Sequence, residues 1–499
     1  MASKIKSTQK RRLRVAALNP PYFPKFSRAS RSPAVTKSST LYYPFFLAYA
    51  TGVLEDEGFE VRLIDAPAAG LGRKETIRAI KEFAPHLVVC ETSTPSIEND
   101  LEVIGELKCA GVPFVAAVGT HVSALSDDVM KANPFLDAVA RGEYEHTIRD
   151  LAVALDSGES SLENIRGLTW RCGWGIRKNP DREYIEELDS LPFVSRVYRD
   201  HLRSHIGAYF YGANLHPVVT ILSGRGCPHR CAYCVYPQTM TGNAYRFRSV
   251  GNLVDELEFI KRELPEAKEV FIEDDTLTAD RERARAIARE IISRGLKIRW
   301  SANSRADADY ETMRLMRRAG LRLLCVGFES GSQEILNRLG KNIRYEKYMK
   351  FRGDARRAGV LIHGCFMYGN EGETRETMEG TLELAKSLGC DSAQFYPIMV
   401  YPGTRSYESF REKGYIKASS FRDWLTPDGL HNCIVSLPEI SAEELVEFSD
   451  RSRREFYLRS GYILSKVVQM ITRPSEAKRL LRAGKALSRF IIGPERTRP

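Results

Sequence analysis

VVTILSGRGCPHRCAYCVY, residues 218–236, joins an apolar segment to a cysteine-rich loop. The β-branched run at 218–222 predicts a buried strand, and the two glycines that follow predict its end. Cys227, Cys231 and Cys234 lie in the loop after this strand, and the carboxyl ends of strands are where α/β folds place their chemistry. We therefore expect the three thiols to form the centre of a functional site.

The spacing CxxxCxxC supplies three thiolate ligands, and no fourth cysteine lies nearby. Iron–sulfur clusters are the metal centres that thiolates usually hold, normally through four ligands. Three cysteines would leave one iron of a four-iron cube open to an outside ligand. The alternatives are inert thiols or a zinc site, which needs two ligands besides Cys231 and Cys234. His229 is wedged too tightly between two cysteines to serve, and spaced cysteines in a reducing compartment are more often metal-binding or catalytic.

This loop, with Tyr233 before the third cysteine, resembles the cluster motif of the radical S-adenosylmethionine (SAM) superfamily. The resemblance covers most of the chain. It implies that Cys227, Cys231 and Cys234 hold a [4Fe-4S] cluster whose open iron binds the amino and carboxylate groups of SAM. An electron from the cluster would then cleave SAM to methionine and a 5′-deoxyadenosyl radical. An external donor of the flavodoxin or ferredoxin type would have to supply that electron.

Composition limits the class of protein. The 499 residues are 43% hydrophobic and 28% charged, as in a globular protein of two or three domains. There is no membrane-length apolar run and no secretory signal, and the ten scattered cysteines do not suggest disulfides, so a cytoplasmic location is expected. The net charge of +10 comes from the ends: residues 451–499 hold 13 Lys and Arg against three Glu, and residues 1–14 hold six more cations. Because the body is near neutral, nucleic-acid binding is not expected.

The N-terminal part alternates short apolar strands with amphipathic helices. Residues 1–12 are expected to be a disordered basic terminus. Residues 13–155 are expected to form a Rossmann-like, doubly wound parallel sheet, because strands and helices alternate there. The expected strands are 13–18, 60–65, 86–90, 113–119 and 137–140. Such a sheet binds its ligand at the carboxyl ends of the strands, and without GxGxxG a dinucleotide is a poor candidate.

This domain resembles the cobalamin-binding domain of B12-dependent radical SAM enzymes. The resemblance rests on three motifs that follow predicted strands: NPP at 19–21, GTH at 119–121 and RGE at 141–143. It implies bound cobalamin, with Asn19, Thr120 and His121 as candidate contacts. The DxHxxG motif that supplies an axial histidine in other cobalamin enzymes is absent, so no histidine is expected on cobalt. His121 can alternatively be read as a loop histidine with a backbone partner.

The rest of the chain begins with a connector at 156–213, which includes a hairpin near 173–175. Residues 214–410 resemble the radical SAM core. Six predicted strands, each followed by a helix, indicate a partial (β/α)6 barrel of the TIM type with its site on the carboxyl rim. Cys325 and Cys365 lie on these strands and are expected to be buried core thiols.

Acidic and basic side chains end several barrel strands. Glu273 and Asp274 follow the second strand in place of the GGE motif of the family, and the resemblance implies contact with SAM. They could alternatively cap the next helix. The resemblance also implies that Arg305, after the third strand, pairs with the SAM carboxylate. Glu329 and Ser330, after the fourth strand, are expected to bond to SAM.

The C-terminal segment, 411–499, is expected to be helical and to close the site. Ser441 predicts a helix start, because acidic residues and an apolar pattern follow it. From 478 to 491 apolar and cationic residues recur on opposite helix faces, a pattern typical of a helix at a membrane surface. The alternative is a helix packed on the barrel with its charges in water. The apolar positions are Leu480, Gly484, Leu487 and Ile491, and the cations are Lys478, Arg482, Lys485 and Arg489.

The resemblance implies a cobalamin-dependent radical SAM enzyme, most simply a methyltransferase. Its class methylates cob(I)alamin with one SAM, and a second SAM gives the radical that abstracts hydrogen from an unactivated carbon. The substrate radical then takes the methyl group. The alternative is a cyclase, rearrangement or C–C bond-forming enzyme with the same cofactors, as in pigment or hopanoid-type lipid pathways. A non-catalytic sensor is less consistent with the intact CxxxCxxC and several barrel-end motifs, because a sensor needs no SAM pocket. The substrate is expected to be a small molecule or lipid, with peripheral membrane contact through the basic tail.

Overall fold

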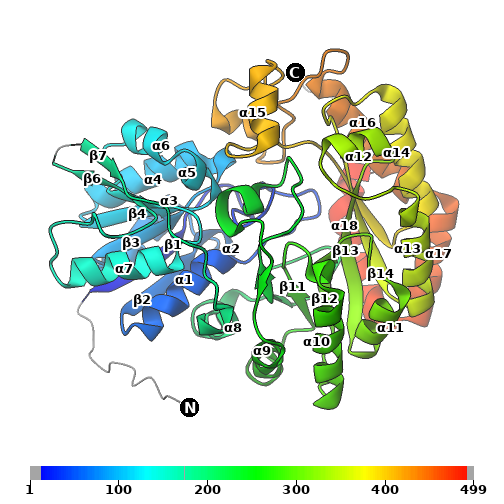
Figure 1. The fold of residues 1–499 in the computed structure, drawn as a ribbon, viewed down its shortest axis with the longest axis horizontal. Coiled ribbons are helices and arrows are strands. Elements are labelled where there is room, and N and C mark those ends of the chain that lie inside the picture. The colour runs from blue at the N-terminus through cyan, green and yellow to red at the C-terminus, as the bar shows by residue number, and fades with distance from the viewer. Residues whose placement is uncertain (1–12, 174, 492–499) are drawn as a thin grey trace.

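The computed structural model describes residues 13–173 and 175–491. It contains two α/β units side by side, with helices of the C-terminal segment behind the second unit (Figure 1). This arrangement confirms the predicted class: a Rossmann-like parallel sheet, a partial barrel and a helical C-terminus. The predicted disorder of residues 1–12 lies outside the described residues. No helix in the described ranges is long and apolar enough to cross a membrane.

The first unit is a seven-stranded sheet in the order β2-β1-β3-β4-β5-β6-β7. The pairs from β2 to β5 are parallel, and β6 and β7 join antiparallel. Its strands are β1 (Arg14–Asn19), β2 (Glu60–Asp65), β3 (Leu87–Glu91), β4 (Phe114–Val118), β5 (Ala138–Ala140), β6 (Leu168–Cys172) and β7 (Gly175–Lys178). The hairpin expected in the connector thus extends this sheet past residue 155. The hairpin extends the sheet because β5 pairs with β4 on one side only, and the backbone N–H and C=O groups on its other side pair with β6.

Helices cover both faces of this sheet, as a doubly wound fold requires. They are α1 (Phe45–Asp56), α2 (Ala66–Ala69), α3 (Arg73–Phe83), α4 (Ile97–Cys109), α5 (Thr120–Ala124), α6 (Ser126–Ala132) and α7 (Glu145–Asp156). The segment between β1 and α1 is exceptionally long and leaves the first unit to reach the second. This excursion brings Arg31 into contact with Glu273 of the second unit.

The second unit is a six-stranded parallel sheet in the order β8-β11-β12-β13-β14-β15. Its strands are β8 (Val218–Ile221), β11 (Glu269–Ile272), β12 (Trp300–Ser304), β13 (Leu321–Glu329), β14 (Leu361–Tyr368) and β15 (Ser392–Pro397). Its helices are α9 (Val250–Glu263), α10 (Arg281–Ser293), α11 (Tyr310–Arg318), α12 (Gln333–Arg338), α13 (Lys347–Ala358), α14 (Arg375–Leu388) and α15 (Arg405–Glu412). The first and last strands do not pair, so the barrel is open on one side.

The C-terminal segment becomes helical only from residue 442, later than expected. Residues 413–441 are mainly irregular and include the short helix η7 (Phe421–Trp424). The helices that follow are α16 (Ala442–Tyr457), α17 (Ser460–Thr472) and α18 (Pro474–Ile491). The Ser441 side chain accepts the amide of Glu444, which confirms the predicted cap. The irregular stretch instead lies over the first unit, where Arg422 pairs with glutamates of α4.

Candidate active site

A cavity of about 810 Å³ opens at the carboxyl rim of the barrel. Its volume is in the range of small-molecule sites. The cysteine loop and strand ends β11–β15 form one wall, the excursion after β1 forms another, and α17 and α18 contribute apolar side chains. Three parts of the chain that are distant in sequence therefore enclose one site.

All three cysteines of the CxxxCxxC loop face this cavity. Backbone contacts fix the loop: the amide of Ala232 donates to Leu339 O at 2.9 Å, and the Gln238 side-chain amide donates to Cys234 O at 2.8 Å. Burial raises the pKa of Cys227 to about 11, so its thiolate requires a nearby positive charge such as iron. Three preplaced soft donors facing one space fit the expected cluster.

The loop also depends on a glycine and an acid. Gly226 has a φ of +83°, and a Cβ there would lie 2.1 Å from Ala244 O, so only glycine fits. Asp274 accepts bonds from the amides of Ser223 and Gly224 at 2.6 and 3.0 Å. The structure thus places Asp274 outside the cavity, as an anchor between β11 and the cysteine loop. Its expected contact with SAM has no support in this geometry.

Acidic groups do line the cavity beside the cysteines. Glu273 and Asp275 face it, and both are paired with Arg31, which donates to Asp275 Oδ1 at 3.0 Å. Asn303 donates to Glu273 Oε1 at 3.3 Å. Burial raises the pKa of Glu273, an effect that Arg31 opposes. This acidic pair is suited to a cationic ligand group, and Arg31 fills that role in the present structure.

Glu329 is a further acidic residue that lines the cavity, and its backbone is strained. Its φ of +65° is rare for a residue with a side chain, and the register of β13 with β14 shifts at this point. The turn aims the carboxylate into the cavity, where Lys341 donates to it at 2.7 Å and the Tyr233 hydroxyl at 2.8 Å. Arg305 also lines the cavity and donates to the backbone carbonyl of Lys341.

Two further expectations differ from the structure. Ser330 is fully buried outside the cavity, where its hydroxyl lies 3.2 Å from that of Thr381. Cys325 and Cys365 are not core thiols: both are half-buried and line the cavity. They point inward because side chains alternate along a strand and these positions belong to the barrel's interior face.

The expected cobalamin contacts lie at the carboxyl edge of the first sheet. Asn19 is buried and donates to Asp65 at 2.9 Å. Thr120 begins α5, and His121 beside it is buried with Nδ1 3.1 Å from the Thr94 hydroxyl. Burial lowers the pKa of His121 to about 3, so it is neutral. Phe421 of the C-terminal segment packs edge-on against it, with ring centroids 4.6 Å apart.

Between this edge and the cysteine loop lies a seam of unsatisfied polar groups. Glu91 Oε2 and the hydroxyls of Tyr144 and Tyr236 are buried without a hydrogen-bond partner among the described residues. The three groups interact electrostatically, and burial raises the pKa of Glu91 to about 8. Buried polar groups normally have partners. Unpaired donors and acceptors between the two units therefore fit a large polar cofactor such as cobalamin.

A buried ion-pair cluster joins the two units at the same seam. Arg225, on the short strand β9 (Gly224–Arg225), donates to Glu145 at 2.6 Å. Arg246, on β10 (Arg246–Phe247), donates to both oxygens of Glu143 at 2.8 and 2.7 Å. All four side chains are at most 5% exposed. The glutamate of the RGE motif thus fastens the cysteine loop to the first unit.

The barrel, the loop of three cysteines and the acidic rim define a radical SAM enzyme. The sequence matches the family model of the radical SAM superfamily over residues 221–385 and that of the B12-binding domain over residues 31–152. The chain therefore carries a radical SAM domain together with a B12-binding domain. Its cofactors are SAM, a [4Fe-4S] cluster and cobalamin.

Similar proteins extend along most of the chain. An uncharacterized methyltransferase of Pyrococcus horikoshii is 29% identical, with 85% of this chain and 90% of that protein covered. The anaerobic magnesium-protoporphyrin IX monomethyl ester cyclase of Rubrivivax gelatinosus is 25% identical, with 84% and 74% covered. The radical SAM methyltransferase TsrM of Kitasatospora setae, solved with cobalamin and a [4Fe-4S] cluster, has the same fold, with a TM-score of 0.68. The two sequences are 18% identical, and the match covers 90% of this chain and 89% of TsrM.

Proposed function

We propose that this enzyme methylates an unactivated carbon of a predominantly apolar small molecule or lipid. The observation that carries the proposal is the cavity: cysteine loop, acidic rim and apolar helices share one enclosed space. Ile463, Val467, Met470 and Leu480 line this cavity. Apolar side chains there remove an apolar substrate from water, a gain of about 25 cal/mol per Å² of buried apolar surface.

The residues at the rim have separate roles in this proposal. When bound, the cluster supplies the electron that cleaves SAM, and cobalamin supplies a cobalt centre that carries the methyl group. Glu273 and Asp275 would hold the SAM ammonium group once Arg31 moves aside. Arg305 would pair with the SAM carboxylate, and Glu329, fixed by Lys341, would accept a bond from SAM. The enclosed cavity would exclude water from the reacting centre.

The domains divide this work. We assign residues 13–155 to cobalamin, 214–410 to the cluster and SAM, and 411–499 to closing the site, with 156–213 as the connector. Asn19, Thr120 and His121 lie at the sheet edge that would hold cobalamin. His121 is proposed not to bind cobalt, because its Nδ1 contacts Thr94 and its ring packs on Phe421. A nitrogen superhyperfine pattern in cob(II)alamin-loaded protein that is lost in His121→Ala would contradict this assignment.

A cyclase or rearrangement is the second candidate, favoured by the similarity to the Rubrivivax gelatinosus cyclase over 84% of this chain. Product mass separates the two reactions, because methylation adds one CH2. The test is incubation of reconstituted enzyme with a bacterial lipid extract and SAM labelled in its methyl group. Label in a lipid product supports methyl transfer, whereas an unlabelled product of altered mass supports the cyclase.

Delivery of electrons and substrate completes the proposal. The reductant would be a protein of the flavodoxin or ferredoxin type in the cytoplasm. The substrate would enter from a membrane surface, because Leu464, Val468 and Ile471 of α17 are 64%, 50% and 75% exposed beside the cavity. Lys478 and Arg482, in the first half of α18, are exposed cations suited to anionic lipid. The side chains of Leu487, Arg489 and Ile491, also part of the expected amphipathic pattern, lie outside the described residues.

A further inference from the structure

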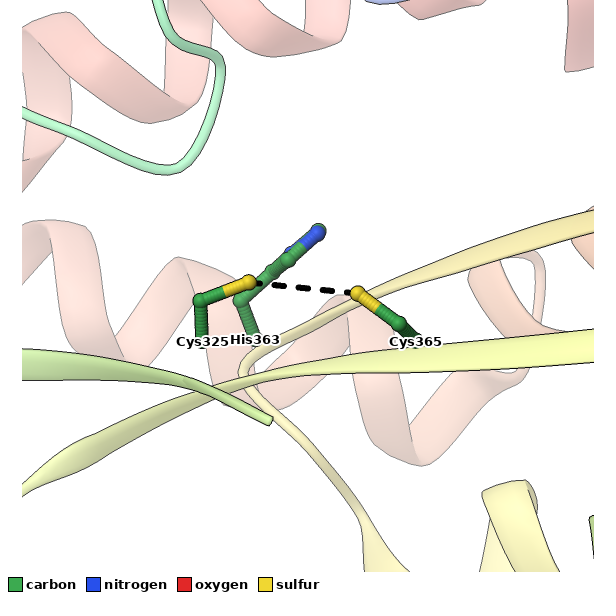
Figure 2. Close-up of side chains that lie close together, drawn as sticks. All are labelled: Cys325, His363 and Cys365. Atoms are coloured by element: carbon green, nitrogen blue, oxygen red, sulfur yellow. Dashed lines mark hydrogen bonds between the residues drawn. The ribbon is translucent and has the colours of Figure 1, made fainter. Parts of the chain in front are cut away.

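Three side chains in the barrel interior converge apart from the cysteine loop. Cys325 of β13 and His363 and Cys365 of β14 offer ligand atoms that all lie within 4.8 Å of one another. Figure 2 shows the two thiols facing each other across the strands with the imidazole beside them. All three are half-buried and line the cavity. These three side chains could hold a metal ion, and none of them belongs to the CxxxCxxC loop.

The spacing of the two sulfurs suits a tetrahedral zinc site. Cys325 Sγ and Cys365 Sγ are 3.9 Å apart. Two thiolates at the usual Zn–S distance of about 2.3 Å and a tetrahedral angle would be separated by roughly 3.8 Å. A disulfide would require the sulfurs to approach to about 2.05 Å. The pair is therefore already spaced for a shared metal ion.

The strand register explains why these residues meet. Cys325 is the register partner of His363, and Gly327 is the partner of Cys365. Residues 363 and 365 lie on the same face of β14 because side chains alternate with a period of two. The arrangement thus belongs to the barrel backbone and does not depend on a loop.

Polar neighbours are placed to orient the imidazole. His363 Nδ1 lies 2.8 Å from the Ser392 hydroxyl, and Gln394, two residues further along β15, lines the same cavity. A histidine that binds a metal through one nitrogen normally has a partner that fixes the other. Both neighbours come from β15, so the ring is held from the adjacent strand.

We propose that Cys325, His363 and Cys365 bind one Zn²⁺ ion whose fourth position faces the substrate cavity. Two thiolates and one imidazole favour zinc among the common divalent ions, and three protein ligands leave one position open. On binding, the two thiols release their protons to solvent, and the site of two thiolates and Zn²⁺ is neutral overall. A neutral site is compatible with a largely apolar cavity, where an isolated charge would be unfavourable.

The position of the ion defines what it could bind. Cys325 lies four residues before Glu329 on β13, about 13 Å deeper at 3.3 Å per residue. The ion would lie beneath the rim proposed for SAM, where a substrate would enter. Resting on the proposed function, we infer that the open position takes an oxygen or nitrogen donor of the substrate. An otherwise apolar molecule would thereby be held in one orientation.

Metal content tests the site without turnover. Anaerobically reconstituted enzyme is incubated with ZnCl2 and passed over a chelating resin, and zinc and iron are then measured by mass spectrometry. Wild type is expected to retain about one zinc and four irons per chain. Cys325→Ser, His363→Ala and Cys365→Ser should lose zinc at least fivefold and keep their iron. Cys390→Ala is the matched control, because that buried thiol lies near Gly364 of the same strand but outside this cavity.

Zinc K-edge absorption then identifies the ligands, and iron does not obscure it. The proposal expects two sulfurs at about 2.3 Å and nitrogen or oxygen neighbours at about 2.0 Å. A wild-type zinc content no higher than that of Cys325→Ser would overturn the proposal. Three sulfur neighbours together with loss of iron would also overturn the proposal, because zinc would then occupy the CxxxCxxC loop. A protein mass lower by two hydrogens would overturn it as well, because Cys325 and Cys365 would then form a disulfide. A zinc-loaded enzyme that forms no methylated product would refute the proposed function and leave the metal site standing.

Discussion

Removing one charge from the buried ion-pair cluster should destabilise the whole chain. Glu143 is 3% exposed and accepts two bonds from Arg246 and one from the amide of Ile185. Glu143→Gln preserves the shape but leaves the arginines with one fewer anion in a buried site. Breaking a buried pair costs about 3–5 kcal/mol in the free energy of unfolding. With an m-value of about 3 kcal/mol/M, the urea midpoint should fall by about 1–2 M.

The assay is urea unfolding of the apoprotein followed by circular dichroism. Glu334→Gln is the control, because its pair with Arg338 is exposed and worth less than about 0.5 kcal/mol. The double variant Glu143→Gln/Arg246→Met should recover part of the loss, since it removes both charges. High salt should change the wild-type value little, because the pair is buried. A Glu143→Gln midpoint equal to that of the control would refute the inference that these ion pairs hold the two units together.

Three further predictions concern the seam, the rim and the C-terminal helices. Burial raises the pKa of Glu91 from 4.5 to about 8. Between these two pH values only the unfolded chain loses the proton. The folding stability of the apoprotein should therefore fall by up to about 1.4 kcal/mol for each pH unit in this range. Glu91→Gln should flatten that dependence in urea titrations, and equal slopes would contradict it. Glu329→Gln should weaken SAM binding about 10- to 100-fold at unchanged iron content, through loss of a charged hydrogen bond; an unaltered Kd in calorimetry would exclude Glu329 as a contact. Wild type should float with anionic vesicles at low salt and Leu464→Asp/Ile471→Asp should not; identical behaviour would remove the membrane proposal.

Local sequence was sufficient for the parts of the site that lie on one loop. Cys227, Cys231 and Cys234 lie on one loop after β8, all within 13 residues of its end, so their common direction into the cavity could be anticipated. Alternating strands and helices likewise predicted both sheets, because hydrophobic period and element length are local properties. The cap at Ser441 belongs to the same group.

Contacts between distant segments could not be anticipated. Arg31 reaches Glu273 across 242 residues of sequence, and no local pattern marks that contact. Asp274 and its neighbour Asp275 are chemically equivalent in sequence, and only the turn after β11 decides which one faces the cavity. A signal was available for His363 and Cys365, since residues two apart on a strand share a face. It was missed because strand thiols are usually buried packing groups.

We expect this enzyme to cleave SAM in two ways, once to donate methyl and once to form a radical. The most direct test of this expectation is anaerobic incubation of enzyme reconstituted with iron, sulfide and cobalamin, together with SAM and a low-potential reductant. We expect both S-adenosylhomocysteine and 5′-deoxyadenosine. Cys231→Ala should abolish 5′-deoxyadenosine, whereas Cys109→Ser, at an exposed thiol, should not. Production of 5′-deoxyadenosine alone would contradict methyl transfer, and absence of both products would contradict the account as a whole.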